Sequence, residues 1–196
     1  MEFSDLRRLP KLIVFDLDFT LWPLWIDTHI SGPPFKIDSK RTACVTSCEN
    51  EPVQLYKDVP AILHAIKNMK DVKIGIASRT HEPLWAKQIL EIMPIPNGEN
   101  SFCTLQSMID QAEIYPGTKL KHFSRFHDRL KIDYKDMLFF DDEKRNIDEV
   151  GQKLGVHSVL VKGELTYGDF QQALQEFSAH TKDITAIHSH IASRLI

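Results

Sequence analysis

A short apolar run that ends in two aspartates constrains the fold of this chain more than any other segment. Leu12–Phe15 is wholly apolar, and Asp16 and Asp18 follow it in VFDLDFTLW. Such a run predicts a buried strand of a parallel sheet, in which residues i and i+2 point to the same side. The two carboxylates therefore converge on one spot, where a cation, a proton or a phosphoryl-like ligand relieves their repulsion.

A second acidic pair follows another short apolar run, in FFDDE. Asp141 and Asp142 of that run join Asp16 and Asp18, which gives four carboxylates at two predicted strand ends. Carboxylate oxygens suit a hard divalent cation such as magnesium. The pattern predicts a magnesium site built from distant parts of the chain, although a helix N-cap would explain Asp142 about as well.

Predicted strands and helices alternate along the chain. Five short, largely apolar segments predict strands at 12–15, 72–77, 101–105, 137–140 and 156–161. Capping residues and first-turn prolines predict that helices begin near Asp58, Pro83, Thr118, Lys144 and Thr166. This order favours an α/β fold: a Rossmann-like, three-layer α/β/α domain around a central, mainly parallel five-stranded sheet.

One stretch, 22–56, breaks this alternation with several prolines and a glycine, and we predict a small β-flap insert there. It is too short and too rich in proline for a large cap domain. We expect a single domain over 1–180 and a C-terminal tail over 181–196. Three flap residues have two readings, as a wall for a substrate or as the flap's own small core: Trp22, Trp25 and His29.

The composition excludes several classes of partner. The 24 Lys and Arg against 27 Asp and Glu give a formal net charge of −3, without the basic field that nucleic acid attracts. Three cysteines are few and odd in number, which argues against a disulfide scaffold and favours a reducing compartment. No signal segment is evident, and no stretch approaches the roughly 18 apolar residues of a membrane span. We expect a soluble monomer in the cytoplasm or the nucleus.

The residues at the predicted strand ends suit the hydrolysis of a phosphate monoester. In parallel sheets of this kind, ligands bind beyond the carboxyl ends of the strands. One carboxylate can attack phosphorus, and a second can protonate the leaving oxygen and then activate water. Asp16 and Asp18 fit these two roles. Ser78, after the second strand, and Lys119, near a helix start, can hold the phosphoryl group, with Lys121 as a rival for Lys119.

Four segments resemble the haloacid dehalogenase-like (HAD) phosphatases. FDLDFTL resembles the first motif of that family, DxDxT, and Ser78, Lys119 and FFDDE resemble motifs two, three and four, in the family order. The segments FDLDFTLW, ASRT, EIYPGTK and FFDDEKRNI are closer still to its magnesium-dependent phosphatase branch. The resemblance spans most of the chain.

The resemblance implies a mechanism through an aspartyl-phosphate, with Mg²⁺ as cofactor. Asp16 would be the nucleophile and a magnesium ligand. Asp18 would be the acid/base, with its backbone carbonyl on the metal. Asp141 would be a further ligand, and Asp142 would bind the metal directly or orient a metal-bound water.

The resemblance also implies how a substrate is held. Ser78 and Lys119 would hold the phosphoryl group, and Arg79 would touch the substrate or the phosphate. The implied substrates are phosphotyrosine-like protein or aryl phosphates, or sugar phosphates that include the fructosamine-6-phosphate type. The alternatives are a serine phosphatase of the RNA polymerase II tail, from the same superfamily, and a non-catalytic phosphoprotein-binding module.

Overall fold

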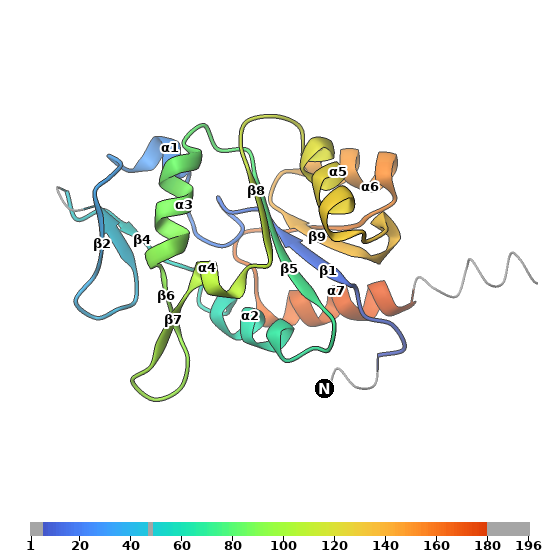
Figure 1. The fold of residues 1–196 in the computed structure, drawn as a ribbon, viewed down its shortest axis with the longest axis horizontal. Coiled ribbons are helices and arrows are strands. Elements are labelled where there is room, and N and C mark those ends of the chain that lie inside the picture. The colour runs from blue at the N-terminus through green and yellow to red at the C-terminus, as the bar shows by residue number, and fades with distance from the viewer. Residues whose placement is uncertain (1–5, 47–48, 180–196) are drawn as a thin grey trace, which may run out of the picture.

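A parallel five-stranded sheet, in the order β10-β9-β1-β5-β8, forms the centre of the computed structural model (Figure 1), which describes residues 6–46 and 49–179. Its strands are β1 (Leu12–Phe15), β5 (Lys73–Ser78), β8 (Gln111–Ile114), β9 (Met137–Asp141) and β10 (His157–Leu160). The α/β class and the five-stranded parallel sheet are thus confirmed. The predicted tail, 181–196, lies outside the described residues.

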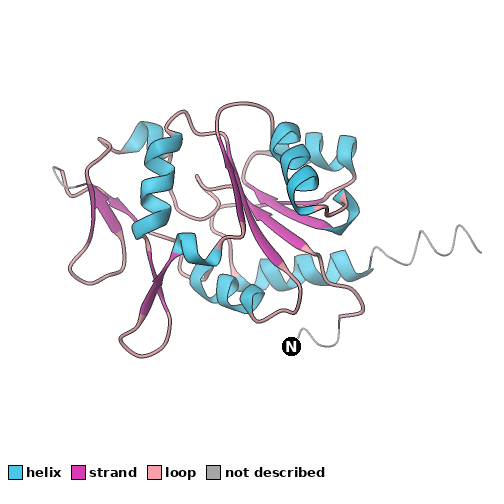
Figure 2. Ribbon diagram, in the orientation of Figure 1, coloured by secondary structure: helices cyan, strands magenta, loops and turns pink. Residues whose placement is uncertain are grey.

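Alternate side chains of the strands build two cores, one on each face of the sheet. Ile13 and Phe15 of β1 pack with α2 and α7, whereas Leu12 and Val14 pack with α5 and α6. Figure 2 shows helices on both sides of the sheet, which is the predicted three-layer arrangement. The helices are α2 (Val59–Lys67), α3 (Pro83–Ile92), α4 (Leu105–Met108), α5 (Lys119–Leu130), α6 (Lys144–Leu154) and α7 (Tyr167–Ala179), with a 3₁₀ turn at Tyr134–Asp136. Among the described residues, no helix has the length and apolarity that crossing a bilayer requires.

Local capping signals set some helix starts but not others. Thr118 caps α5, since its hydroxyl accepts from the backbone N–H of Lys121. The predicted cap by Asp58 is wrong: Asp58 precedes α2, but its carboxylate makes no cap hydrogen bond there. It accepts instead from the backbone N–H of Tyr167, at 2.9 Å, and so joins the starts of α2 and α7.

One predicted strand pairs outside the central sheet. The segment expected at 101–105 forms β7 (Phe102–Thr104), which pairs antiparallel with β6 (Pro94–Pro96) in a separate hairpin. The fifth strand of the sheet is β8, which the sequence pattern did not reveal because QAEI is half polar. Glu113 of β8 is buried and forms an ion pair with Arg129 at 3.2 Å, so a polar residue occupies a strand position inside the protein.

The insert at 22–56 forms a β-flap, as predicted. It consists of the short helix α1 (Ile26–His29) and an antiparallel sheet of β2 (Phe35–Ile37), β3 (Cys44–Thr46) and β4 (Pro52–Val53). The flap rests on α3 through Gly32, whose φ is +88°. A Cβ at this position would lie 2.4 Å from the ring of Trp85, so only glycine permits this contact.

Candidate active site

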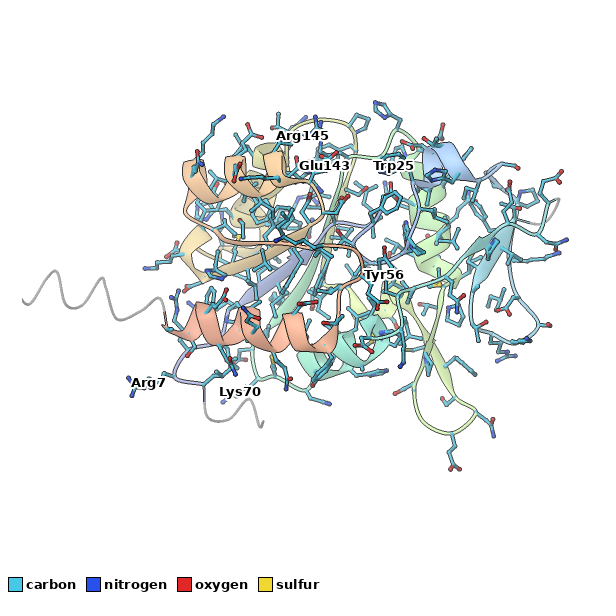
Figure 3. The ribbon with its side chains drawn as sticks, turned by 180° about the vertical axis from the view of Figure 1, so that it is seen from behind. Arg7, Trp25, Tyr56, Lys70, Glu143 and Arg145 are labelled. Carbon is cyan, nitrogen blue, oxygen red and sulfur yellow. The ribbon has the colours of Figure 1, made fainter. Side chains whose placement is uncertain are left out.

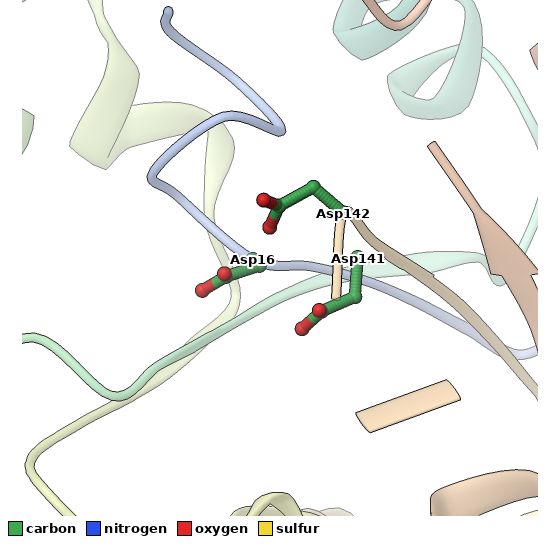
Figure 4. A group of neighbouring side chains, drawn as sticks. All are labelled: Asp16, Asp141 and Asp142. Atoms are coloured by element: carbon green, nitrogen blue, oxygen red, sulfur yellow. The ribbon is translucent and has the colours of Figure 1, made fainter. Parts of the chain in front are cut away.

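The carboxyl ends of adjacent strands place three predicted aspartates side by side. Asp16 follows β1, and its backbone N–H donates to the carbonyl of Phe140 in β9 at 3.0 Å. Asp141 ends β9, and Asp142 follows it. One carboxylate oxygen from each of Asp16, Asp141 and Asp142 lies within 4.8 Å of the other two (Figure 4). The sheet register therefore brings together two acidic motifs from distant parts of the sequence.

A fully buried ammonium group lies between two of these carboxylates. Nζ of Lys119 is 2.8 Å from Oδ1 of Asp16 and 2.9 Å from Oδ2 of Asp141. Burial lowers the pKa of Lys119, but attraction to both carboxylates more than offsets this, so its pKa is raised and it stays charged. The rival Lys121 is exposed on the same helix, with its Nζ over the ring of Tyr115.

The acidic cluster carries more negative charge than Lys119 neutralises. Burial raises the pKa of Asp16 above its usual range; Lys119 opposes this rise, and repulsion from Asp141 adds to it. Burial and then repulsion from Asp141 raise the pKa of Asp142 to about 6. A second cation relieves such repulsion, and magnesium prefers oxygen ligands. The three carboxylates therefore fit a magnesium ion.

Asp18 is held by the flap, through two hydrogen bonds to one oxygen. Its Oδ1 accepts from Nε1 of Trp22 at 2.7 Å and from the backbone N–H of Ile26 at 3.4 Å. Burial raises the pKa of Asp18 to about 6, although both hydrogen bonds act to lower it. Trp22 is itself fully buried and belongs to the core that also contains Ile13 and Phe15, so it forms neither a substrate wall nor a separate core of the flap. The second tryptophan of the flap, Trp25, is 48 % exposed.

Ser78 and Arg79 lie at the end of β5. The Ser78 side chain is buried, and its Oγ accepts from the backbone N–H of Thr80. Arg79 donates from Nε to the carbonyl of Gly117 at 2.7 Å and from Nη1 to Oδ1 of Asn146 at 3.2 Å. Arg79 thereby joins the loop after β5 to the loop before α5 and to the first turn of α6.

Asn146 belongs to this site but was missed in the sequence. Its Nδ2 lies 2.9 and 3.2 Å from the two carboxylate oxygens of Asp141 and 2.9 Å from Oε2 of Glu143. An asparagine in the first helical turn after an acidic pair is the signal that could have revealed it. The N-cap reading of Asp142 is wrong, because Glu143 occupies that position and makes no side-chain cap hydrogen bond.

An open cavity of about 240 Å³ exposes the site to solvent. Figure 3 shows Trp25 beside α1, and Glu143 and Arg145 at the start of α6. Lys119 and Asp141 lie beneath, fully buried. The cavity is lined by Asp16, Asp18, Trp25, Asp27, Ser78, Arg79, Thr80, His81, Asp142, Glu143, Arg145 and Asn146.

This fold and this cluster of side chains define a HAD-like hydrolase. The chain matches the acid phosphatase family over residues 8–180, and it belongs to that family. It is 39% identical to magnesium-dependent phosphatase 1 of Homo sapiens over 173 residues, which are 88% of this chain and 90% of that protein. It is 40% identical to a HAD-like hydrolase superfamily protein of Schizosaccharomyces pombe over 149 residues, which are 76% of this chain and 84% of that protein.

A solved structure shows the same fold. A haloacid dehalogenase-like family hydrolase from Xanthomonas campestris superposes with a TM-score of 0.58 at 11% identity, covering 88% of this chain and 99% of that one. At this identity the similarity concerns the fold alone. The family membership and the two relatives make the chain a phosphatase of the HAD superfamily.

Proposed function

We propose that the chain is a magnesium-dependent phosphomonoesterase that works through an aspartyl-phosphate on Asp16. The observation that carries this proposal is the position of Lys119 Nζ, within 3 Å of both Asp16 and Asp141. A nucleophile, a phosphate-binding cation and a set of oxygen donors for a metal are thereby joined at one sheet edge. The name of the human relative states magnesium dependence, in agreement with this donor set.

Asp16, Asp141 and Asp142 are the residues that would hold magnesium. When bound, the ion supplies positive charge that offsets the repulsion between an anionic nucleophile and an anionic phosphoryl group. Asn146 orients Asp141 for this role through its two short contacts with that carboxylate.

The two aspartates after β1 divide the chemistry. The Asp16 carboxylate attacks phosphorus, the bond to the leaving oxygen breaks, and Asp18 donates a proton to that oxygen. Asp18 then takes a proton from the water that hydrolyses the acyl-phosphate. Because both hydrogen bonds to Asp18 reach Oδ1, we assign the proton in transit to Oδ2. The pKa of Asp18, about 6, suits a group that both gives and takes a proton near neutral pH.

Ser78 and Lys119 hold the transferring phosphoryl group. The Ser78 hydroxyl donates to one phosphoryl oxygen, and the Lys119 ammonium stabilises the charge that gathers on the others. Arg79 lines the same cavity and joins the loop that follows Ser78 to the loop that precedes Lys119.

The open cavity supports substrates that extend from the site into solvent. We propose phosphotyrosine-like protein or aryl phosphates, or sugar phosphates that include the fructosamine-6-phosphate type. The complete set of Asp16, Asp18, Ser78, Lys119 and Asp141 argues against a non-catalytic phosphoprotein-binding module. The thiols of Cys44 and Cys103 are free, in keeping with the reducing cytoplasm that we propose as its location.

Hydrolysis of an aryl phosphate by the wild type and by Asp16→Asn, with magnesium and with a chelator, tests the proposal. Asparagine keeps the shape of the side chain but is a poor nucleophile, so we expect turnover to vanish while the thermal unfolding transition stays cooperative. Wild-type turnover without magnesium, or full turnover in Asp16→Asn, would contradict the mechanism. Asp110→Asn is the matched control, because the Asp110 carboxylate lies outside the cavity and pairs with Lys67.

A further inference from the structure

An exposed tryptophan ring lies at the mouth of the phosphoryl site. Trp25 is 48 % exposed, yet it lines the same cavity as Asp16, Asp18 and Ser78. A large aromatic side chain in solvent leaves apolar surface uncovered. At the entrance of a polar cavity, that surface is available to the part of a substrate that projects from the phosphate.

The Trp25 ring is held in place by two neighbours. It stacks on His29 with 5.5 Å between centroids and 6° between planes, and the edge of Phe19 meets it at 5.0 Å. The backbone N–H of Trp25 also donates to Nδ1 of His29 at 2.9 Å, which fixes the stacked partner. Because His29 and Phe19 hold the Trp25 ring in place, this aromatic platform exists before a ligand binds.

Phe19 supports this platform from a strained backbone. Its φ is +54°, and it is the only aromatic residue among the described residues with a positive φ. Bulky side chains rarely adopt this conformation, which glycine adopts readily. Strain of this kind persists near functional sites when the side chain has a use there. The contacts of Phe19 with Trp25 and His29 supply that use.

From these two features we infer that Trp25 determines specificity, and that it favours phosphate monoesters whose leaving group is a planar aromatic ring. The inference rests on the proposed function, because Asp16 must receive the phosphoryl group for the leaving group to face Trp25. Phe19 is a positioning residue that acts through Trp25. Two aromatic rings prefer offset-stacked or edge-to-face contacts, and a puckered sugar or an aliphatic chain lacks the π-system that gives such a pair its added stability.

A pair of substrates that differ in planarity tests this inference. Phenyl phosphate and cyclohexyl phosphate have similar size, but only the first is flat. We expect Trp25→Ala and Trp25→Leu to lower the ratio of their kcat/KM values by about threefold to tenfold, the range of one aromatic pair. Comparing ratios between variants cancels the intrinsic reactivity of the two leaving groups. Trp25→Phe, which keeps a flat ring, should restore most of the wild-type ratio.

Phe19→Gly separates positioning from folding. Glycine accepts the φ of +54° without strain, which offsets part of the packing lost with the half-buried Phe19 side chain, so thermal unfolding should stay cooperative. The preference for phenyl phosphate should nevertheless fall in the same direction as in Trp25→Ala, because the ring loses its support. The matched control is Leu84→Ala: Leu84 is 68 % exposed but outside the cavity, so its removal should leave the ratio unchanged.

The outcomes distinguish this inference from the proposed function. If the wild type hydrolyses neither ester with magnesium, the proposed function is wrong and this inference falls with it. If it hydrolyses both, and the Trp25 variants keep the wild-type ratio, only the inference is overturned. If the Trp25 variants do lower the ratio, kcat/KM for a phosphotyrosine peptide is compared with kcat/KM for free phosphotyrosine. A higher value for the peptide indicates a protein substrate, and equal values indicate a small aryl phosphate.

Discussion

The phosphoryl site and the flap wall beside it are built in opposite ways. Asp16 and Asp141 lie at the ends of strands, and the Lys119 Nζ between them is fully buried. Trp25 and His29 lie on and beside a single helical turn, and both are exposed to solvent. In the proposed mechanism, the sheet fixes the chemistry, whereas the flap presents the surface that a leaving group meets. Changes in the first region should remove activity, and changes in the second should redirect it.

The largest effect is expected from Lys119→Met. It leaves two buried carboxylates without their shared cation, so kcat should fall by about 10²–10³-fold. The free energy of unfolding in chelator should fall by about 3–5 kcal/mol. Urea unfolding and hydrolysis of phenyl phosphate measure the two losses.

Lys121→Met is the control for this change, since Lys121 is exposed two residues further along the same helix. It should alter neither quantity appreciably. Magnesium should stabilise Lys119→Met more than it stabilises the wild type, because the ion then supplies the missing positive charge. An unchanged urea midpoint together with wild-type kcat would show that Lys119 does not neutralise the cluster.

Asn146→Ala should have the next largest effect. It removes the amide that orients Asp141, and losses of such supporting partners typically lower metal affinity or activity by about 10- to 100-fold. A magnesium titration of activity measures the change. Gln152→Ala, at an exposed position of the same helix, is the control. If Asn146→Ala keeps both the magnesium requirement and kcat of the wild type, Asp141 does not depend on this amide.

Gly32→Ala should act on the flap alone. Both Gly32 and Gly98 have a positive φ, so alanine at either position strains the backbone by about 1–2 kcal/mol. Only at Gly32 does the added Cβ meet a ring, that of Trp85, for a further loss of about 1–3 kcal/mol. The extra destabilisation over Gly98→Ala, measured by urea unfolding, should accompany a change of a few-fold in the ratio of phenyl to cyclohexyl phosphate hydrolysis. Equal unfolding midpoints for the two variants would mean that the flap adjusts without strain.

The smallest effect on activity is expected at the far end of the sheet. Asp136 accepts from Arg8 at 2.6 Å and pairs with Lys11 at 2.9 Å. Burial raises the pKa of Asp136, but these two cations more than offset that, so its pKa is lowered. A lowered pKa stabilises the fold above the unfolded value of 3.8, and this contribution is lost as the pH falls through the folded value.

Asp136→Asn should therefore reduce the free energy of unfolding by about 1–2 kcal/mol at pH 7. The difference from the wild type should shrink as the pH falls below 4, while kcat/KM at pH 7 stays unchanged. Urea unfolding at several pH values measures it. A difference that grows toward acid pH would contradict the assigned sign.

The centre of the fold could be predicted from the sequence because two of its central strands are wholly apolar. Leu12–Phe15 and Met137–Phe140 are wholly apolar and end in acidic pairs, so both their burial and the meeting of their carboxyl ends follow from the pattern. The strand β8 could not be found in this way. Its Glu113 is compensated by Arg129, a partner from a different element that only tertiary structure supplies.

The same limit applies to the site. The residues that resemble family motifs were predictable because each carries its own local context. Asn146 stands in one of these segments, FFDDEKRNI, but its contact with Asp141 depends on the distance between the first turn of α6 and the end of β9, which only the tertiary structure supplies. The division between Trp22 and Trp25 was not predictable either: both lie in WPLW, and only the path of the flap buries one and exposes the other.

The buried ammonium of Lys119 has a consequence for how the enzyme matures. Small zinc domains need their metal to fold, because the ligands alone cannot form a stable interior. Here the Lys119 ammonium already balances part of the acidic interior, so we expect the chain to fold without magnesium and to need the ion for turnover alone. The protein would then remain folded when magnesium is scarce and begin turnover when the ion returns, without refolding.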